Sequence, residues 1–501
     1  MSAKRRILLI GLDAADPGLL RQGLERGALP NLAGLAKDGA WGLATAPPGF
    51  GSGAIWPCFY TGVSPARHGR YFYRQVGPGD YEATRFDADR FGAPAIWKVL
   101  SDGGRRVAAF DVPKAGLSGE LDGLEVVDWL VHGPVYKELR TLPESFGAEL
   151  SARFGSDPMP QCDQPGGRNA RQHLELRDLL LARIRTKEEA SRHYFAREPW
   201  DFFATVFADP HCVGHQCWHV RDPGHPLHDA EAAALVGDPV MDVYAAIDAS
   251  IGRMLEDVDD ETLVLVVSCT GMGPNYTGNY VLDEILRRLE GRSKTLGFDV
   301  WGRLKASAKR VLPLGLRKRG RRLSRRVEER VAHGDRQQRS CFTVPHNDIA
   351  GAVRINLVGR EPGGRVRPEE VQGFFERLKR DLLEVTNLDT GTPIVEDVVL
   401  TADYCEGERL ADLPDLFVLW RRDAPMDRVG SPKIGEIRHV HRGNRTGDHN
   451  ADSLFFARGP GVAPGEIPPV SVLDFAPTLA ALSGVAMPET DGKVIEALLD
   501  R

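Results

Sequence analysis

Short apolar runs separated by helical patterns constrain the fold of this chain more than any other feature of its sequence. The six runs that suit buried strands are 7–12, 107–112, 202–208, 263–268, 416–420 and 453–457. The stretches that suit helices include 16–38, 174–196 and 241–258. Strands that alternate with helices in this way predict an α/β fold around a mainly parallel central sheet.

Polar side chains follow several of these predicted strands directly. Asp13, Asp209 and the pair Cys269 and Thr270 each come immediately after one of the apolar runs. In sheets of this class, binding sites form beyond the carboxyl ends of the strands. Position alone therefore predicts that these four side chains lie near a functional site.

Metal-binding side chains are concentrated in the segment 207–219. His211 and His215 are four residues apart, so on a helix both imidazoles face the same way and can present two nitrogen ligands to zinc. His449, in a later segment, supplies a third imidazole. Isolated histidines are more often structural, but this density of ligands favours a metal site. Three neutral ligands would leave the charge of zinc undiminished, with a bound water of pKa about 7.

A glycine-flanked serine, Ser52, lies in the turn Gly51-Ser52-Gly53, before a stretch able to start a helix. A serine in such a turn can expose its hydroxyl group as a nucleophile. The helix N-terminus behind it offers backbone N–H groups to an anion. The plainer alternative is an ordinary turn in which Ser52 is the N-cap of the helix.

Five sequence blocks together resemble the alkaline phosphatase superfamily, and within it the type I phosphodiesterase/nucleotide pyrophosphatase-like branch. The blocks are Gly11-Leu12-Asp13, Leu29-Pro30-Asn31-Leu32 with Leu35 and Gly39, Ser52 with Trp56, Thr61-Gly62, Pro65 and His68-Gly69, Gly447-Asp448-His449, and 472–479. The resemblance implies an alkaline phosphatase-like three-layer α/β/α sandwich. Residues 291–340 break the pattern of strands and helices and predict a basic insert, so we expect a catalytic core of 1–290 and 396–501 and a small subdomain or cap at 341–395.

The resemblance also implies two metal ions, commonly zinc, and a serine or threonine that attacks phosphorus. Asp13 and Ser52 would belong to one ion. The ligands implied for the other ion are Asp209 or His211, His215 and His449.

Two departures from the family pattern concern these ligands. The family usually has an aspartate four residues before the histidine that matches His215, and here that position is His211. Cys269 and Thr270 stand where the family has an aspartate and a histidine, so they become the candidate ligands there. A thiolate binds zinc well, but threonine is a poor replacement for imidazole. We therefore expect the ion beside Ser52 to be weakly held, differently coordinated or missing.

These residues predict a metal-dependent hydrolase or transferase of phosphate esters, above all a phosphodiesterase, with Ser52 as the nucleophile. Zinc, as one or two ions, is expected in preference to manganese or magnesium. Arg70, Tyr73 and His219 are the candidate substrate contacts, although packing beside the site explains Arg70 and Tyr73 equally well. The alternatives are a catalytically degenerate relative that binds a phosphorylated ligand or partner, and a single-metal enzyme with altered chemistry in a biosynthetic pathway.

Charge and cysteine content bear on partners and location. A formal net charge of -6 over 501 residues gives no reason to expect nucleic-acid binding. The run 7–12 is too short for a signal-peptide core, and seven scattered cysteines do not indicate a secreted disulfide framework, so we expect a cytoplasmic location. The basic stretch 317–326 is either a solvated helical excursion or a surface for anionic lipid or a polyanionic substrate, with membrane contact through 303–330.

Overall fold

The computed structural model of the chain contains two compact units. The residues that the structure describes are 5–86, 91–159, 162–163, 167–292, 333–347, 349–439 and 444–499. Unit 1 comprises Met1–Tyr71, Asp87–Asn275 and Arg442–Arg501. Unit 2 comprises Phe72–Phe86 and Tyr276–His441. Most of the expected basic insert at 291–340, including the segment 303–330 with its expected membrane contact, lies outside the described residues.

Unit 1 is built around one large sheet whose five central strands run parallel. In spatial order these strands are β9 (Thr262–Ser268), β1 (Arg6–Leu12), β8 (Phe202–Phe207), β5 (Val107–Phe110) and β6 (Gly123–Val127). Every residue of β8 and β9 is buried, which explains their unbroken apolar sequences. The four apolar runs in the first 270 residues are therefore confirmed as parallel strands.

Shorter or antiparallel strands complete the two sides of this sheet. The remaining strands of the sheet are β2 (Ala40–Thr45), β7 (Arg140–Leu142), β19 (Asp452–Arg458), β20 (Gly465–Glu466) and β21 (Val470–Ser471). The expected strand at 453–457 corresponds to β19, which runs antiparallel between β9 and β2. The sheet is thus mainly parallel, with antiparallel pairing toward its edges.

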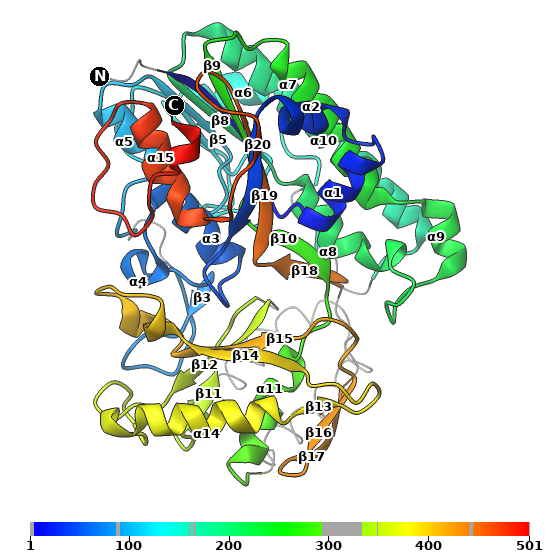
Figure 1. Cartoon of the computed structure of the whole chain (residues 1–501), viewed down its shortest axis with the longest axis vertical. Coiled ribbons are helices and arrows are strands. Elements are labelled where there is room, and N and C mark those ends of the chain that lie inside the picture. Colours follow the sequence, from blue (N-terminus) through cyan, green and yellow to red (C-terminus); the bar gives the residue numbers. More distant parts are fainter. Residues whose placement is uncertain are drawn as a thin grey trace. The chain divides into compact units, whose positions relative to one another are not determined.

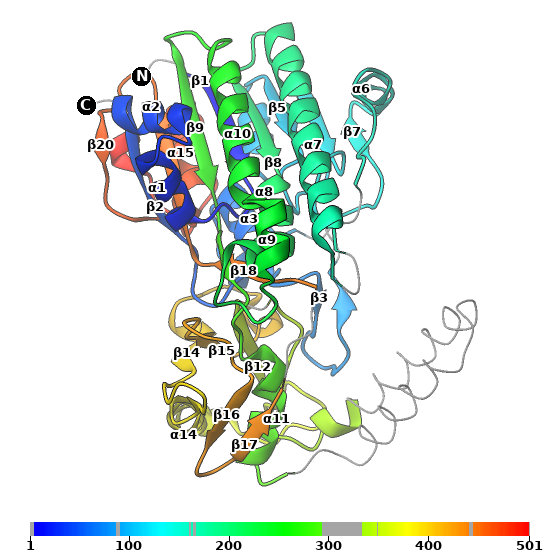
Figure 2. The same cartoon turned by 90° about the vertical axis from the view of Figure 1, so that its right-hand side faces the viewer.

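Helices cover both faces of this sheet, as the two views in Figures 1 and 2 show. Helices α1 (Pro17–Glu25), α2 (Pro30–Asp38), α7 (Ala170–Arg197) and α10 (Pro239–Leu255) belong to one layer. The opposite layer contains α3 (Ser52–Thr61), α5 (Ile96–Asp102) and α15 (Phe475–Leu482). The first layer and its face of the sheet share one continuous apolar core. Unit 1 therefore has the expected three-layer α/β/α architecture.

The expected helix over 16–38 is in fact two helices. Helix α1 ends at Glu25, and Gly27 then adopts a left-handed backbone conformation with φ of 71°. Pro30 is the first residue of α2, a position where its missing N–H group costs nothing. The single-helix prediction was wrong because it ignored this glycine and proline.

The apolar run 416–420 is also a buried strand, but it lies in unit 2. This strand, β15 (Leu416–Trp420), pairs antiparallel with β12 (Ala350–Ile355) and β14 (Val395–Leu400). Strands β14 and β15 therefore share a sheet with β12, which was expected in the small subdomain, and the contacts assign Tyr276–His441 to unit 2. A boundary at residue 396 would cut through β14.

Unit 2 has its own apolar core between antiparallel strands and two helices. Its elements are β3 (Arg74–Gln75), β4 (Thr84–Arg85), α11 (Asn279–Leu289), β11 (Cys341–Thr343), β12, α14 (Val371–Leu383), β13 (Thr386–Asn387), β14, β15, β16 (Arg428–Ser431) and β17 (Gly435–Arg438). Helices α11 and α14 contribute Ile285 and Leu382 to this core, and neither side chain is exposed. Each unit is thus stabilised by apolar burial of its own.

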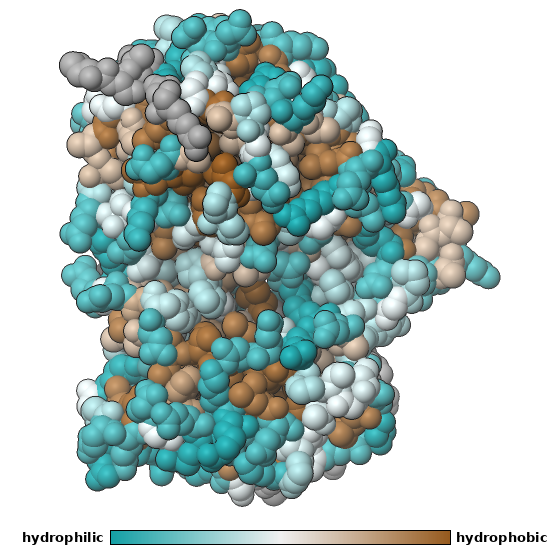
Figure 3. All heavy atoms as spheres, in the orientation of Figure 1, coloured by the Kyte–Doolittle hydropathy of each residue, from teal (hydrophilic) through white to brown (hydrophobic). Residues whose placement is uncertain are grey.

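The surface of unit 1 includes one helix with a markedly exposed apolar residue. Leu235 lies on α9 (Ala230–Val236) and is 74% exposed. The outer end of α9 is apolar on the face drawn in Figure 3. Over the described residues, no helix combines the length and apolar character that crossing a membrane requires.

Helix α2 receives its N-terminal cap from another helix. Its own N-cap residue, Leu29, makes no side-chain capping hydrogen bond. Asp248 of α10 instead accepts hydrogen bonds from the backbone N–H groups of Asn31 at 3.1 Å and Leu32 at 2.8 Å, and from the Asn31 side chain at 2.9 Å. Asp248 is buried, so its carboxylate satisfies donors that water does not reach. This interaction holds two helices of the first layer together.

We expect Asp248→Asn to lower the free energy of unfolding by about 2 kcal/mol, because an amide group would then face buried N–H donors. Urea unfolding followed by circular dichroism measures the change. Asp242→Asn, an exposed substitution on the same helix, is the matched control and should change the stability by less than about 0.5 kcal/mol. Equal midpoints for both variants would contradict the capping role.

Candidate active site

Ser52 begins helix α3 directly after an extended glycine. Gly51 is the N-cap, so Ser52 is the first helical residue and the N-cap alternative for Ser52 was wrong. The Ser52 side chain is 4% exposed. Because α3 starts here, its free backbone N–H groups lie next to the serine.

Asp13 is tied to the same helix through a tryptophan. It follows β1, is 2% exposed, and accepts a hydrogen bond from Nε1 of Trp56 at 2.8 Å. Burial raises the pKa of Asp13 to about 6, and the nearby charge of Lys114 opposes this rise. One carboxylate oxygen is thus engaged by an indole N–H group rather than left open for an ion.

The three predicted histidines do come together. His211 and His215 lie one turn apart on α8 (Asp209–Arg221), and His449 lies on β18 (Gly447–Asn450). The ring centroids are 4.4 Å apart for His211 and His215, and each lies 4.9 Å from that of His449. One ligand atom from each residue falls within 4.8 Å of the others, and all three side chains are buried. We call this group the three-histidine cluster.

Protonation in the three-histidine cluster suits metal binding. Burial holds the pKa of His211 and that of His215 well below the usual histidine value, so both rings are neutral. Nδ1 of His215 donates to the carbonyl oxygen of Gly447 at 2.6 Å, which leaves Nε2 with its lone pair. Nδ1 of His211 is buried without a hydrogen-bond partner. A buried nitrogen of this kind and three convergent imidazoles fit a divalent ion.

A close backbone approach brings β18 to helix α8. A Cβ atom on Gly447 would lie only 2.4 Å from the carbonyl oxygen of Gly214, so only glycine fits here. The N–H group of Thr446 donates to the carbonyl oxygen of His215 at 2.7 Å. Strand β18 also pairs antiparallel with β10 (Gly271–Pro274), which follows β9. These contacts position His449 against the two histidines of α8.

Asp209 forms an ion pair with Arg183 and does not lie with the three histidines. Its Oδ1 accepts a hydrogen bond from Nε of Arg183 at 2.8 Å, and Arg183 is 1% exposed. The arginine also lies 3.4 Å from Asp157. Among the described residues, Asp209 belongs to no group of three metal-ligating side chains. The structure therefore favours His211 over Asp209 as the ligand on α8.

The other half of the expected two-metal site lacks a fitting set of ligands. Burial, together with the negative charge of Asp13, raises the pKa of the Cys269 thiol well above its usual value, so the thiol stays protonated. Oγ1 of Thr270 lies 3.5 Å from Nδ1 of His449 rather than with Asp13. In the part of the chain that the structure describes, no group of three metal-ligating side chains includes Asp13 or Cys269. The residues present do not fit a second ion beside Ser52.

Two cations near the site were missed by the sequence reasoning. Lys114 follows β5, so the rule that selected Asp13 could have selected it as well. Its ammonium group donates to the carbonyl oxygen of His132 at 3.1 Å, and burial lowers the pKa of Lys114 to about 8. Arg445 donates to Asp163 at 2.6 Å, while its Nη1 lies 3.5 Å from Nε2 of His215. Positive charge therefore borders the three-histidine cluster, which suits an anionic substrate.

The three expected substrate contacts have different surroundings. Nη1 of the buried Arg70 donates to the carbonyl oxygen of Lys114 at 3.2 Å. His219 lies on α8 with Nδ1 3.0 Å from Oγ1 of Thr446, and burial lowers the pKa of His219 to about 4. Tyr73 is 56% exposed and belongs to unit 2, where its ring packs on Phe72. Only Arg70 and His219 therefore lie in the unit that carries the site.

Comparison with known proteins gives a family match and several solved structures with a similar fold. A family model described as type I phosphodiesterase / nucleotide pyrophosphatase matches residues 7–424. No curated protein matches the sequence. Murine ectonucleotide pyrophosphatase/phosphodiesterase 5 is 11% identical, with 98% of each chain covered and a TM-score of 0.51. The human protein of that name is 12% identical, with 99% of this chain and 100% of that chain covered and a TM-score of 0.50.

A third similar structure is an inactive murine form in complex with AMP, which is 10% identical. It covers 99% of this chain and 100% of its own, with a TM-score of 0.51. These likenesses confirm the alkaline phosphatase-like fold. The family match extends over most of the sequence, and the chain belongs to the type I phosphodiesterase / nucleotide pyrophosphatase family of phosphoric ester hydrolases.

Proposed function

We propose that this chain is a zinc-dependent phosphodiesterase with Ser52 as its nucleophile and a single ion at its active site. The observation that carries the proposal is the convergence of His211, His215 and His449 within 4.8 Å. Imidazole nitrogens favour zinc over magnesium, which prefers oxygen ligands. An ion bound to this cluster would polarise a phosphoryl oxygen of the substrate as a Lewis acid.

In the proposed reaction, Oγ of Ser52 forms a bond to phosphorus while the bond to the leaving alkoxide breaks. The alkoxide leaves with the proton of the serine hydroxyl group. Water then cleaves the serine-linked phosphodiester, which releases a phosphomonoester and restores the hydroxyl group of Ser52. The N-terminal N–H groups of α3 stabilise negative charge on the phosphoryl oxygens next to Ser52. Lys114 and Arg445 add positive charge around the site. These groups take over part of the charge stabilisation that a second ion would provide.

A nucleotide-like phosphodiester is the proposed substrate class. One structure with the same fold is a complex with AMP, and the family model names nucleotide pyrophosphatases. We further propose a cytoplasmic location, because all seven cysteines are free in the structure.

We expect Ser52→Ala to lower the rate of bis-p-nitrophenyl phosphate hydrolysis by at least about 1000-fold, because the attacking oxygen is removed. The measurement is the release of p-nitrophenol by the purified protein with zinc. Ser64→Ala is the matched control, since Oγ of Ser64 is a buried serine oxygen without a hydrogen-bond partner. Equal rates for wild type and Ser52→Ala would exclude Ser52 as the nucleophile.

We expect His215→Ala to reduce bound zinc by one ion per chain and to abolish hydrolysis, because one of three ligands is lost. Mass spectrometric metal analysis after dialysis against a weak chelator measures the change. His193→Ala, which removes a half-buried imidazole on α7, should keep the zinc content of the wild type. An unchanged zinc content in His215→Ala would refute the proposed ion site.

The double variant Cys269→Asp/Thr270→His separates an active enzyme from a degenerate relative. If the proposal is right, the wild type already hydrolyses bis-p-nitrophenyl phosphate. The double variant should then bind a second zinc ion and hydrolyse this diester faster. Activity that appears only in the double variant, while wild type still binds AMP, would identify the chain as a binding protein instead.

A further inference from the structure

Arg445 is anchored in unit 1 by one edge of its guanidinium group. The N–H groups of an arginine point along two edges of a planar fork. The edge formed by Nε and Nη2 faces Asp163, whose Oδ2 accepts hydrogen bonds from Nε at 3.2 Å and from Nη2 at 2.6 Å. Nε2 of Gln216 donates to Oδ1 of Asp163 at 2.8 Å, and Gln216 follows His215 on α8. Asp163 therefore ties Arg445 to the helix that carries two histidines of the three-histidine cluster.

The other edge of the Arg445 guanidinium group faces two imidazole nitrogens. Nη1 lies 3.5 Å from Nε2 of His215, and Nη2 lies 3.3 Å from Nε2 of His132. Both distances exceed the usual N–H hydrogen-bond length of about 2.9 Å. An imidazole nitrogen with a lone pair is an uncharged acceptor, and guanidinium groups form shorter and stronger hydrogen bonds with anionic oxygen atoms. This edge therefore suits an anion better than it suits its two present acceptors.

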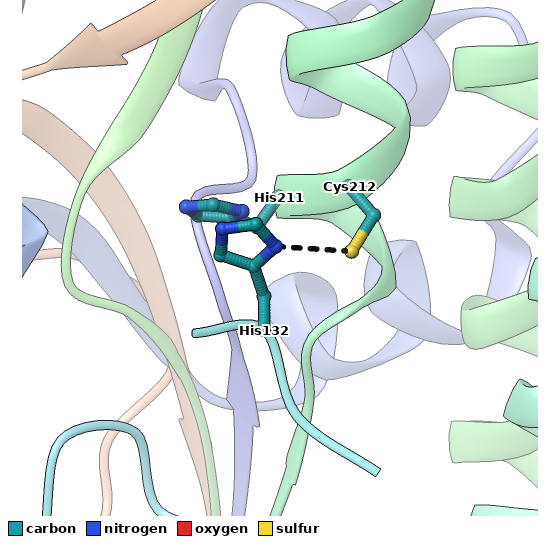
Figure 4. Close-up of side chains that lie close together, drawn as sticks. All are labelled: His132, His211 and Cys212. Carbon is teal, nitrogen blue, oxygen red and sulfur yellow. Dashed lines mark hydrogen bonds between the residues drawn. The ribbon is translucent and has the colours of Figure 1, made fainter. Parts of the chain in front are cut away.

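His132 places this edge of Arg445 beside the three-histidine cluster. The ring centroids of His132 and His211 are 4.1 Å apart, and Figure 4 shows the two rings next to each other. Nδ1 of His132 lies 2.9 Å from Sγ of Cys162 and 3.8 Å from Sγ of Cys212. Contacts on both nitrogens thus hold the His132 ring, and through it Nη2 of Arg445, against one of the proposed zinc ligands.

Solvent can reach Arg445, whereas a second arginine near α8 is enclosed. The side chain of Arg445 is 30% exposed, and that of its partner Asp163 is 34% exposed. The side chain of Arg183 is only 1% exposed, and it pairs with Asp209 at 2.8 Å. Of these two arginines, Arg445 is the one that a ligand entering from solvent can contact.

We propose that Arg445 binds a phosphoryl oxygen of the substrate while the zinc ion of the three-histidine cluster binds another, so that the anion links the two cations. This inference rests on the proposed function, because it places the phosphate group at that ion. Nε2 of His215 has a single lone pair, so it serves either Nη1 of Arg445 or an ion. When the nitrogen binds the ion, Nη1 loses this acceptor, and the phosphoryl oxygen takes its place.

Electrostatics makes the binding of the ion and of the anion cooperative. Three neutral imidazoles leave the charge of zinc undiminished, so the ion and the nearby guanidinium group repel each other. Asp163 offsets part of this repulsion through its ion pair with Arg445. A phosphate group between the two cations replaces their repulsion with attraction on both sides. By linkage, phosphate then strengthens zinc binding by the same factor by which zinc strengthens phosphate binding.

Zinc affinity measured with and without inorganic phosphate tests the proposal on the full chain. A chelator buffer sets the free zinc concentration, and phosphate is present at zero or millimolar concentration. We expect phosphate to lower the zinc dissociation constant of the wild type by at least about 10-fold and that of Arg445→Met by less than about 3-fold. Arg221→Met is the matched control, since this arginine of α8 pairs with Asp238 at 3.3 Å, and it should keep the effect of the wild type.

Equal phosphate effects in the wild type and in Arg445→Met would overturn this proposal and leave the zinc site standing. A wild type that binds no zinc would refute the proposed function and this inference with it. Modification of the wild type by phenylglyoxal, mapped by mass spectrometry, avoids any effect of a variant on folding. We expect zinc and phosphate together to slow the modification of Arg445 and to leave that of Arg221 unchanged. No slowing at Arg445 in zinc-loaded protein would also overturn the proposal.

Discussion

The contact between Gly447 and Gly214 is the constraint on which the candidate site depends. Strand β18 can approach helix α8 only because a glycine leaves room for the carbonyl oxygen of Gly214. The hydrogen bond from His215 to the carbonyl of Gly447 then fixes both the backbone contact and the orientation of the ring. His449 comes two residues later, so the same approach brings the third imidazole into place.

The site is asymmetric about helix α3. On the side of α8, buried and neutral imidazoles converge in a form that binds metal. On the side of Ser52, Trp56 engages Asp13, and Cys269 is a protonated thiol. Under the proposed single-ion mechanism, side chains of the protein would supply the charge stabilisation on the Ser52 side. Lys114 and Arg445 are the cations recorded nearest to the three-histidine cluster.

The central strands and the histidine pair on α8 could be predicted from the sequence, because both depend on interactions between residues close together in the chain. Apolar runs such as 202–207 are buried on both faces, and that requirement marks them as central strands. His211 and His215 were paired correctly because helical periodicity places them on one face. The break between α1 and α2 was also local, but it depended on Gly27 and Pro30, which a search for periodicity overlooks.

The sequence by itself determined the α/β class, the family and the pair of imidazoles on α8. Only the tertiary structure decided that Asp209 pairs with Arg183, that Lys114 borders the site, and that His132 meets Cys162 and Cys212. Local periodicity reports contacts across one helix or strand. These other contacts join segments that are distant in sequence. A buried polar group cannot bond to water, so it bonds to whichever polar side chain the fold places next to it.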